Sequence, residues 1–253
     1  MRFTVLGTGT SHGVPMIGCD CPVCTSPDPR NRRTRCSAYF DVDGVNLLID
    51  TSTELRLQAI ANGVKRVDAI LFTHYHADHV SGLDDVKAFN AAAGGPVRCY
   101  GDEGTYGALQ ERYAYALAGT RWIGAIPHIE FTTIDHEPFE VLGVPVMPIP
   151  LEHGSIRSTG YRVGNVAYLT DCNGVPERSR ELLRGLEVLV LDGLRDRPHP
   201  THFCIPQAVE VIHDLQPRQA YLTHLTHTVD HQATNAALPP RIECAYDGLT
   251  LEL

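Results

Sequence analysis

Four side chains that can bind a cation lie within six consecutive positions of the chain. His74, His76, Asp78 and His79 form the pattern His-X-His-X-Asp-His, and this alternation turns the first two toward one position and leaves the last two for a second. The apolar run 67–72 precedes them and predicts a buried strand that ends in a tight loop. A lone histidine in such a loop would be a hydrogen-bonded structural residue, whereas this cluster indicates a metal site.

The cluster resembles the signature motif of the metallo-β-lactamase superfamily of metallohydrolases. The resemblance implies a two-metal centre that later residues complete in a fixed order. The sequence offers His153, Asp171 and His224 in that order, each after a short apolar run. Upstream, Asp50 closes the run 45–50 and matches the first acidic position of the family. Every element that the resemblance requires is therefore present.

The resemblance also implies how these side chains share the work. We expect them to hold two divalent ions with one carboxylate between: His74, His76 and His153 on the first ion, Asp78, His79 and His224 on the second, and Asp171 bridging. Two such ions, about 3.5 to 4 Å apart, can ionise a bridging water, and the hydroxide then attacks phosphorus. Asp50 would orient the ligands or the water from behind them. Imidazole and carboxylate ligands accept manganese, zinc or iron, so the ligands do not choose the ion.

The cysteines indicate a second, structural metal site. Of eight cysteines, Cys19, Cys21 and Cys24 fall within six residues. Thiols spaced so closely cannot pair with one another without strain, but three of them can converge on one zinc ion if a fourth ligand arrives from elsewhere. A disulfide framework is not favoured, because the chain shows no export signal.

A closer resemblance rests on the Gly-Cys-X-Cys-X-X-Cys run at 18–24 and on the double motif Leu-Thr-His-Leu-Thr-His at 222–227. Both are similar to the cyclic phosphodiesterases of the carbon–phosphorus lyase pathway of phosphonate degradation, which act on phosphoribosyl 1,2-cyclic phosphate. The resemblance implies that His227 completes a structural zinc site within a loop at 18–36. It also implies a catalytic histidine at His202 that protonates the departing oxygen, since imidazole changes its charge near neutral pH. His199 is close by and remains an alternative, although His202 is preferred.

Composition limits the kind of partner. A formal charge of -9 argues against a broad nucleic-acid surface, whereas a small phosphodiester substrate remains compatible because metal ions supply positive charge. The exception is the arginine-rich loop 30–35, for which a solvated loop is favoured over one that contacts phosphate. The stretch 2–7 is too short for a signal peptide and no run is long enough to span a membrane, so we expect a cytoplasmic protein without membrane contact. The oligomeric state stays open, and a homodimer is one state that the sequence allows.

Strands that alternate with helices predict an α/β fold, and the resemblance implies a four-layer αββα sandwich, the metallo-β-lactamase fold. With 253 residues, 43% of them hydrophobic, and no break in composition, we expect a single hydrolase domain spanning 1–253. Among the individual elements, we expect a helix over 103–117 and a closing hairpin of 242–246 with 249–253 around Asp247-Gly248.

The predicted activity is therefore a dinuclear metal-dependent phosphodiesterase that acts on a small, cyclic substrate. One alternative is an RNA 3′-end endonuclease like ribonuclease Z, whose relatives carry a long arm between the third histidine and the bridging aspartate. Here the interval 154–170 predicts only a tight hairpin, which leaves no room for such an arm. Another alternative is a non-catalytic, metal-dependent binding module, against which the complete ligand set argues.

Overall fold

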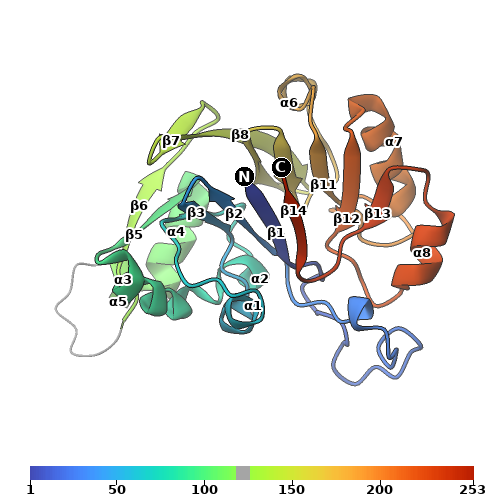
Figure 1. Ribbon diagram of the computed structural model, residues 1–253, viewed down its shortest axis with the longest axis horizontal. Helices are drawn as coiled ribbons and strands as arrows, with labels where there is room; N and C mark the ends of the chain where they lie inside the picture. The colour runs from blue at the N-terminus through green and yellow to red at the C-terminus, as the bar shows by residue number, and fades with distance from the viewer. Residues whose placement is uncertain (118–125) are drawn as a thin grey trace.

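The computed structural model describes residues 1–117 and 126–253, and its centre consists of two seven-stranded sheets packed face to face (Figure 1). The first sheet has the order β14-β1-β2-β3-β4-β5-β6 and the second the order β13-β12-β11-β10-β9-β8-β7. The strands of the first sheet are β1 (Arg2–Gly7), β2 (Ser37–Val42), β3 (Val45–Ile49), β4 (Ala69–Leu71), β5 (Val97–Gly101), β6 (Ile129–Thr133) and β14 (Leu249–Glu252). Those of the second are β7 (Phe139–Val141), β8 (Val144–His153), β9 (Ile156–Val163), β10 (Val166–Leu169), β11 (Val188–Asp192), β12 (Gln219–Thr223) and β13 (Ile242–Cys244).

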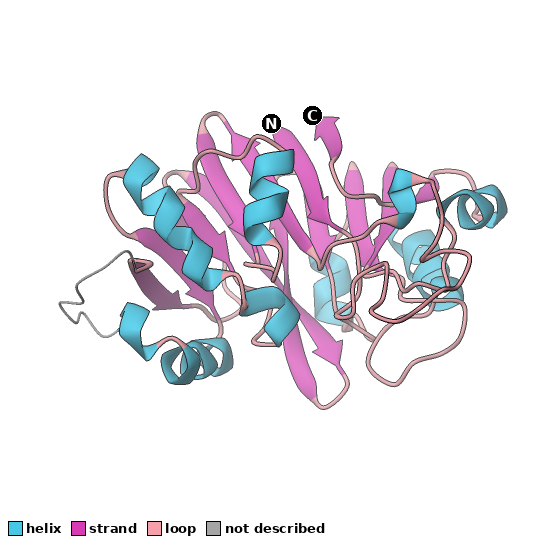
Figure 2. Ribbon diagram, turned by 90° about the horizontal axis from the view of Figure 1, so that it is seen from below, coloured by secondary structure: helices cyan, strands magenta, loops and turns pink. Residues whose placement is uncertain are grey.

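Helices cover the outer faces of both sheets (Figures 1 and 2). The helices beside the first sheet are α1 (Leu55–Ala61), α2 (Ala77–Val80), the 3-10 helix η2 (Leu83–Val86), α3 (Lys87–Ala93), α4 (Glu103–Arg112) and α5 (Ala114–Leu117). Those beside the second are α6 (Glu177–Leu182), α7 (Ile205–Leu215) and α8 (His231–Ala237), and the 3-10 helix η1 (Pro29–Asn31) lies in the cysteine loop. The α/β class and the four-layer order predicted from sequence are confirmed.

Alternate side chains along each strand point to opposite faces of its sheet, and in this way they build three apolar layers. In β3, Leu47 and Ile49 pack between the sheets while Leu48 packs under the helices of the first sheet. In β11, Val188 and Val190 likewise face the first sheet, and Leu189 and Leu191 face α7. Because both faces of these strands are buried, their sequences are continuous apolar runs rather than alternating ones. These rigid inner strands carry the polar residues that follow them.

The closing hairpin predicted for residues 242–253 is wrong. β13 runs parallel to β12 in the second sheet, whereas β14 runs antiparallel to β1 in the first, so the chain passes from one sheet to the other between them. The Asp-Gly pair resembles a local turn, but Asp247 is partly buried. Its carboxylate accepts hydrogen bonds from the amide and the hydroxyl of Thr8 and of Thr34 at 2.6–2.9 Å. These distant partners, invisible in the local pattern, fix the crossing.

Two helices also differ from expectation. The predicted helix over 103–117 breaks at Tyr113, whose hydroxyl donates to the carbonyl of Val80 at 3.1 Å and so ties the break to the motif region. Helix α8 was not predicted, although Asp230 caps it by accepting from the amide of Ala233 at 2.9 Å. Within the described residues, no helix has the length and apolar character needed to cross a membrane.

Candidate metal centre

The predicted site residues lie at strand ends where the backbone takes an unusual conformation. Asp50, Asp171 and His224 follow β3, β10 and β12 within two residues, and their φ angles are 59°, 53° and 60°. Residues other than glycine adopt this left-handed conformation at a cost, and such strain concentrates at functional sites. The sharp turn brings side chains from both sheets to one rim of the sandwich.

The first group contains His74, His76, His153 and Asp171, with ligand atoms that all lie within 4.8 Å of one another. His74 Nε2 is 2.9 Å from His76 Nδ1 and 3.9 Å from Asp171 Oδ1. His153 Nε2 is 4.0 Å from the same carboxylate oxygen. Three imidazoles and one carboxylate thus lie together, and they are the residues that the sequence assigned to the first ion and to the bridge.

The second group contains Asp78, His79, Asp171 and His224, again within 4.8 Å. Asp171 Oδ2 is 3.1 Å from His79 Nε2, and Asp171 Oδ1 is 3.3 Å from His224 Nε2. Asp78 Oδ2 lies 3.3 Å from His79 Nε2 and 3.7 Å from His224 Nε2. Asp171 belongs to both groups, which is the geometry that a bridging ligand needs.

These distances suit metal ions better than direct hydrogen bonds. In a tetrahedral site with ligands about 2.1 Å from the ion, two ligand atoms lie about 3.4 Å apart, and the separations in the second group fall around that value. The buried Nε2 atoms of His79 and His224 have no hydrogen-bond partner in the described residues. Since unpaired buried nitrogens are costly, lone pairs that converge in this way indicate a cation site.

Burial and the neighbouring charges shift the pKa values of the side chains in the cluster. Burial raises the pKa of the Asp171 carboxyl, but His224 and His79 outweigh burial and hold that pKa well below its usual range. Burial lowers the pKa of His79, yet Asp171, Asp78 and Asp50 together raise it well above the ordinary value. Burial lowers the pKa of His74 far below the usual range, which keeps its nitrogens neutral. The cluster therefore supplies ionised carboxylates and a neutral His74, the forms that bind metals, whereas without an ion the surrounding carboxylates keep a proton on His79 that a metal would replace.

Asp50 lies behind the second group rather than in it. Its Oδ1 accepts from the amide of Thr73 at 2.8 Å, while Oδ2 accepts from the Thr73 hydroxyl at 2.8 Å and lies 2.7 Å from His79 Nδ1. A carboxylate in this place fixes which His79 nitrogen faces inward. The contact fits the orienting role expected from the sequence and leaves no open face of Asp50 for substrate.

His202 lies against both groups. Its ring centroid is 4.8 Å from that of His153 and 4.6 Å from that of His224, and its Nδ1 is 2.7 Å from Asp192 Oδ2. The carboxylate can only accept, so Nδ1 donates to it and Nε2 is left for a substrate. His199 lies 5.1 Å from His202 between ring centroids and, within the described residues, belongs to neither ligand group. Of the two candidates, His202 is therefore the one adjacent to the metal groups.

Sequence reasoning missed Asp192. This fully buried carboxylate ends β11 and also accepts from the amide of Cys172 at 2.9 Å. A usable signal was present, because the apolar run 186–191 is followed directly by an acidic residue, just as the run ending at Ile49 is followed by Asp50. A search of every short apolar run for an acidic residue or a histidine directly after it would have found Asp192.

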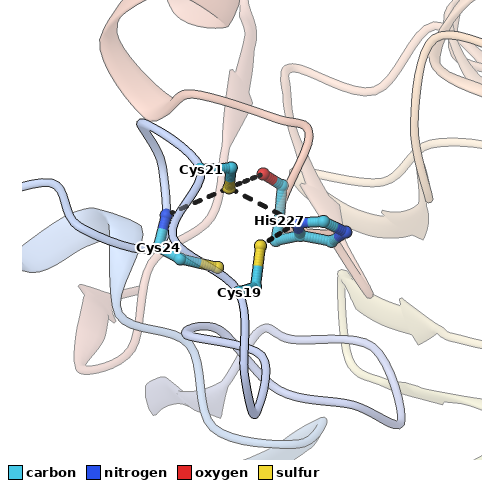
Figure 3. Close-up of side chains that lie close together, drawn as sticks. All are labelled: Cys19, Cys21, Cys24 and His227. Atoms are coloured by element: carbon cyan, nitrogen blue, oxygen red, sulfur yellow. Dashed lines mark hydrogen bonds between the residues drawn. The ribbon is translucent and has the colours of Figure 1, made fainter.

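The three clustered cysteines meet His227, as Figure 3 shows. Cys19 Sγ and Cys21 Sγ lie 3.3 and 3.4 Å from His227 Nδ1. Ligands of a tetrahedral zinc site with sulfur at about 2.3 Å and nitrogen at about 2.1 Å are about 3.6 Å apart, so the four residues fit such an ion. The amide of Cys24 and the His227 ring lower the pKa of Cys21 to about 6, which favours the thiolate.

The arginine-rich loop is neither freely solvated nor open to a ligand along its length. Arg33 is 2% exposed and donates to the carbonyl of Thr226 at 3.0 Å. Arg30 pairs with Asp28, and Arg35 pairs with Glu54. Only Arg32 of the four is exposed without such a partner in the described residues. The loop uses its positive charges to fasten itself to the fold, a role that the sequence alone did not indicate.

The comparisons with known proteins agree with this geometry. A family model described as a β-lactamase superfamily domain matches residues 45–225. That range holds both ligand groups. The chain belongs to the metallo-β-lactamase superfamily.

One superfamily member of known structure is similar over nearly its whole length. A crystal structure described as a new diphosphatase from the PhnP family has 44% sequence identity and a TM-score of 0.93, covering 100% of this chain and 97% of that one. Zinc-bound PqqB from Methylobacterium extorquens, at 20% identity and a TM-score of 0.82, shows the shared fold. The family and the first neighbour support a hydrolase, and the superfamily fold implies divalent metal ions.

Two curated relatives from bacteria match as well. An octanoyltransferase from Porphyromonas gingivalis is 36% identical over 98% of this chain, but the chain spans only 51% of that protein. Because about half of the relative lies outside the match, its named activity does not pass to this chain. Coenzyme PQQ synthesis protein B from Methylobacterium radiotolerans is 27% identical over 76% of this chain and 73% of its own length.

Proposed function

We propose that this hydrolase is a dinuclear phosphodiesterase that cleaves a small cyclic phosphodiester such as phosphoribosyl 1,2-cyclic phosphate. The observation that carries the proposal is the pair of four-residue groups that share Asp171, with His202 packed against both. The neighbour described as a PhnP-family diphosphatase supports phosphorus chemistry at such a centre. Two divalent cations held there would lower the pKa of a shared water and neutralise the phosphoryl oxygens.

The chain's own residues provide position and proton transfer. Asp171 holds the two groups together, and Asp50 and the carbonyl of Thr201 fix the outward nitrogens of His79 and His153 at 2.7 Å each. The rings thereby keep one orientation during the reaction. As water adds to phosphorus, its proton would pass to solvent. As the ester bond breaks, His202, protonated on both ring nitrogens, would give its Nε2 proton to the departing oxygen and keep the Nδ1 proton that Asp192 accepts.

Under this proposal three ions bind each chain, two of manganese, zinc or iron at the centre and one zinc at the cysteine site. The partner is a small phosphodiester, and the proposal needs no extended nucleic-acid surface. The test is metal analysis of the purified protein together with turnover of bis(p-nitrophenyl) phosphate and of a panel of linear and cyclic phosphodiesters. Hydrolysis of cyclic substrates by protein with two centre ions is the expected result. Absence of turnover in metal-replete protein would overturn the proposal.

The variant His202→Ala tests whether His202 is a proton donor or a metal ligand. We expect the variant to keep all of its metal and to lose about 10²- to 10⁴-fold in turnover, the usual contribution of a general acid. His213→Ala, which removes an exposed histidine of α7, is the matched control and should change neither quantity. Loss of centre metal in His202→Ala would show that His202 is a ligand instead, a reading that its proximity to Asp192 and His224 makes worth testing.

A ribonuclease activity has one observation in its favour. A ribonuclease Z from Clostridium acetobutylicum is 38% identical over 85 residues, 32% of this chain. Against it, β9 and β10 occupy most of the interval between His153 and Asp171 and pair as an antiparallel hairpin, so no arm extends from that interval. Cleavage of a precursor transfer RNA at rates comparable to those on small diesters would reverse this preference.

A further inference from the structure

A buried threonine comes directly before three of the proposed metal ligands. The pairs are Thr73-His74, Thr170-Asp171 and Thr223-His224. Each of these threonines is at most 1% exposed, so its hydroxyl needs a hydrogen-bond partner inside the protein. The partners differ between the three, and the difference indicates a role for Thr170.

The Thr170 hydroxyl donates to Asp171 Oδ2 at 2.7 Å. An ionised carboxylate can only accept, and this distance is typical of a charge-assisted hydrogen bond. Besides the imidazoles that face it, no other group in the described parts of the chain hydrogen-bonds to this carboxylate. The torsion that rotates a carboxylate has broad energy wells, so the Asp171 side chain does not fix its own rotation. The threonine is therefore the neighbour that can fix it.

The two oxygens of Asp171 face different neighbours. Oδ2, which accepts from the threonine, lies 3.1 Å from His79 Nε2. Oδ1 lies 3.3 Å from His224 Nε2 in the second group, and 3.9 and 4.0 Å from the Nε2 atoms of His74 and His153 in the first. Oδ1 is therefore the oxygen that lies between the two groups. A rotation of the carboxylate would take Oδ1 out of that place.

We propose that Thr170 is a positioning residue for the bridging ligand, and that its hydroxyl holds Asp171 Oδ2 so that a single oxygen, Oδ1, serves both ions. The inference rests on the proposed function only for the two ions at the centre, and it concerns metal binding rather than the substrate. Groups that hold a metal ligand from behind contribute about 10- to 100-fold to metal affinity. Loss of the Thr170 hydroxyl should therefore weaken the binding of the central ions by that ratio.

Thr223 provides a matched control. Like Thr170 it is fully buried, and the ligand after each threonine has a left-handed backbone, with φ angles of 53° at Asp171 and 60° at His224. The Thr223 hydroxyl, however, lies 3.4 Å from Cys36 Sγ and, among the residues that the structure describes, hydrogen-bonds to no proposed ligand. Thr223→Val thus removes a buried hydroxyl directly before a ligand and leaves the shared carboxylate as it was.

The test measures the affinity of the central sites for manganese in Thr170→Val, Thr170→Ser and Thr223→Val. Thiolates disfavour manganese, so the cysteine site does not contribute to the titration. The electron paramagnetic resonance signal of the free ion gives the dissociation constants, and the signal of the bound pair shows whether two ions share an oxygen, because such ions couple magnetically.

Thr170→Val should bind manganese about 10- to 100-fold more weakly and lose the coupled signal, because the carboxylate has lost its donor. Thr170→Ser should restore both quantities, since serine offers the same hydroxyl, and Thr223→Val should match the unmodified protein. Unchanged affinity in Thr170→Val, or equal losses in Thr170→Val and Thr223→Val, would overturn the proposal.

Folding and catalysis are measured separately from metal affinity. A thermal melt of each variant checks folding, and if Thr170→Val misfolds, Thr170→Ala replaces it in the comparison with Thr170→Ser. Unmodified protein that binds two central ions and cleaves no phosphodiester would contradict the proposed function alone, and the affinities would still decide the role of Thr170. Fewer than two central ions in the unmodified protein would overturn that role, because there would be no bridge to position.

Discussion

The two proposed metal sites differ in how much of the fold holds their side chains. The central cluster draws ligands from strand ends of both sheets, and His74, His79 and Asp171 are 0%, 0% and 2% exposed. The cysteine site draws three ligands from one loop that lies outside the sheets, and Cys19, Cys21 and His227 are only partly buried. We infer that the cluster is largely formed by packing alone, whereas the loop depends on its zinc.

The contacts that support the ligands also differ between the two sites. Behind the cluster stand buried acceptors such as Asp50 and Asp192, each 2.7 Å from a histidine nitrogen. The cysteine site has backbone support mainly from its own turns, and its apolar neighbours are few, with Val14 and Val23 as the buried ones besides Cys24. Where packing is thin, metal–ligand bonds must supply the folding free energy. This difference fits our proposal that the central cluster serves chemistry and the cysteine site serves stability.

Asp171→Ala should have the largest effect on this comparison. Without the shared carboxylate both centre ions should leave, and turnover should fall by at least about 10³-fold. Elemental analysis should then find one remaining zinc per chain, in the cysteine loop. Loss of all three ions would show that the two sites are not independent, and retention of two would contradict the bridging role.

Cys24→Ser should break the other site. Losing one thiolate should release one zinc and lower the melting temperature by at least about 5 °C, since the loop loses its main source of stability. Scanning calorimetry and zinc content measure both. Cys99→Ala, a buried cysteine in β5 remote from either cluster, should leave the zinc count as it was. An unchanged zinc count in Cys24→Ser would refute the structural zinc.

Asp192→Asn tests the support behind the proton donor. The amide oxygen can still accept from His202 Nδ1, but the negative charge is gone, so we expect turnover to fall about 10- to 100-fold with metal content unchanged. The exposed Asp214→Asn, in α7, controls for the lost charge. A drop in centre metal would show instead that Asp192 contributes to the ligand set.

The smallest effect concerns the zinc-free loop. Hydrogen bonding from the Cys24 amide and from His227 lowers the pKa of Cys21 to about 6, whereas burial raises the pKa of Cys24 to about 11. After chelation, Cys21 should react with iodoacetamide at a rate that rises through about pH 6, while Cys24 stays slow up to alkaline pH. Mass spectrometry of the peptides measures each rate. Equal rates at pH 7 would show that zinc loss collapses the loop geometry.

Features of the fold and the site that depend on local sequence patterns could be predicted from the sequence, whereas features that depend on distant contacts could not. His74 to His79, Asp171 and His224 follow short apolar runs, and buried strands with residues at their ends can be recognised from such a pattern. The structure brings all of them to one rim. The metals themselves and the catalytic role of His202 remain predictions that the experiments above address.

What escaped prediction was decided by distant partners. The Asp-Gly pair at 247–248 fits a hairpin, and only the approach of Thr8 and Thr34 to Asp247 shows that the chain changes sheets there. Arg33 was expected at the surface, because the residues near it in the sequence do not show that it donates a hydrogen bond to the carbonyl of Thr226. Such pairings join residues about two hundred positions apart, where local propensity carries no information.

The short segment from His224 to His227 serves both proposed sites, and Leu225 within it bonds to Thr8 and Thr10 of the first loop. This arrangement constrains when metal can bind during synthesis of the chain. A ribosome must extend the chain about two hundred residues beyond Cys24 before either site can close, so these cysteines have to stay reduced until His227 emerges. Metal loading of either site therefore has to follow synthesis of the segment from His224 to His227.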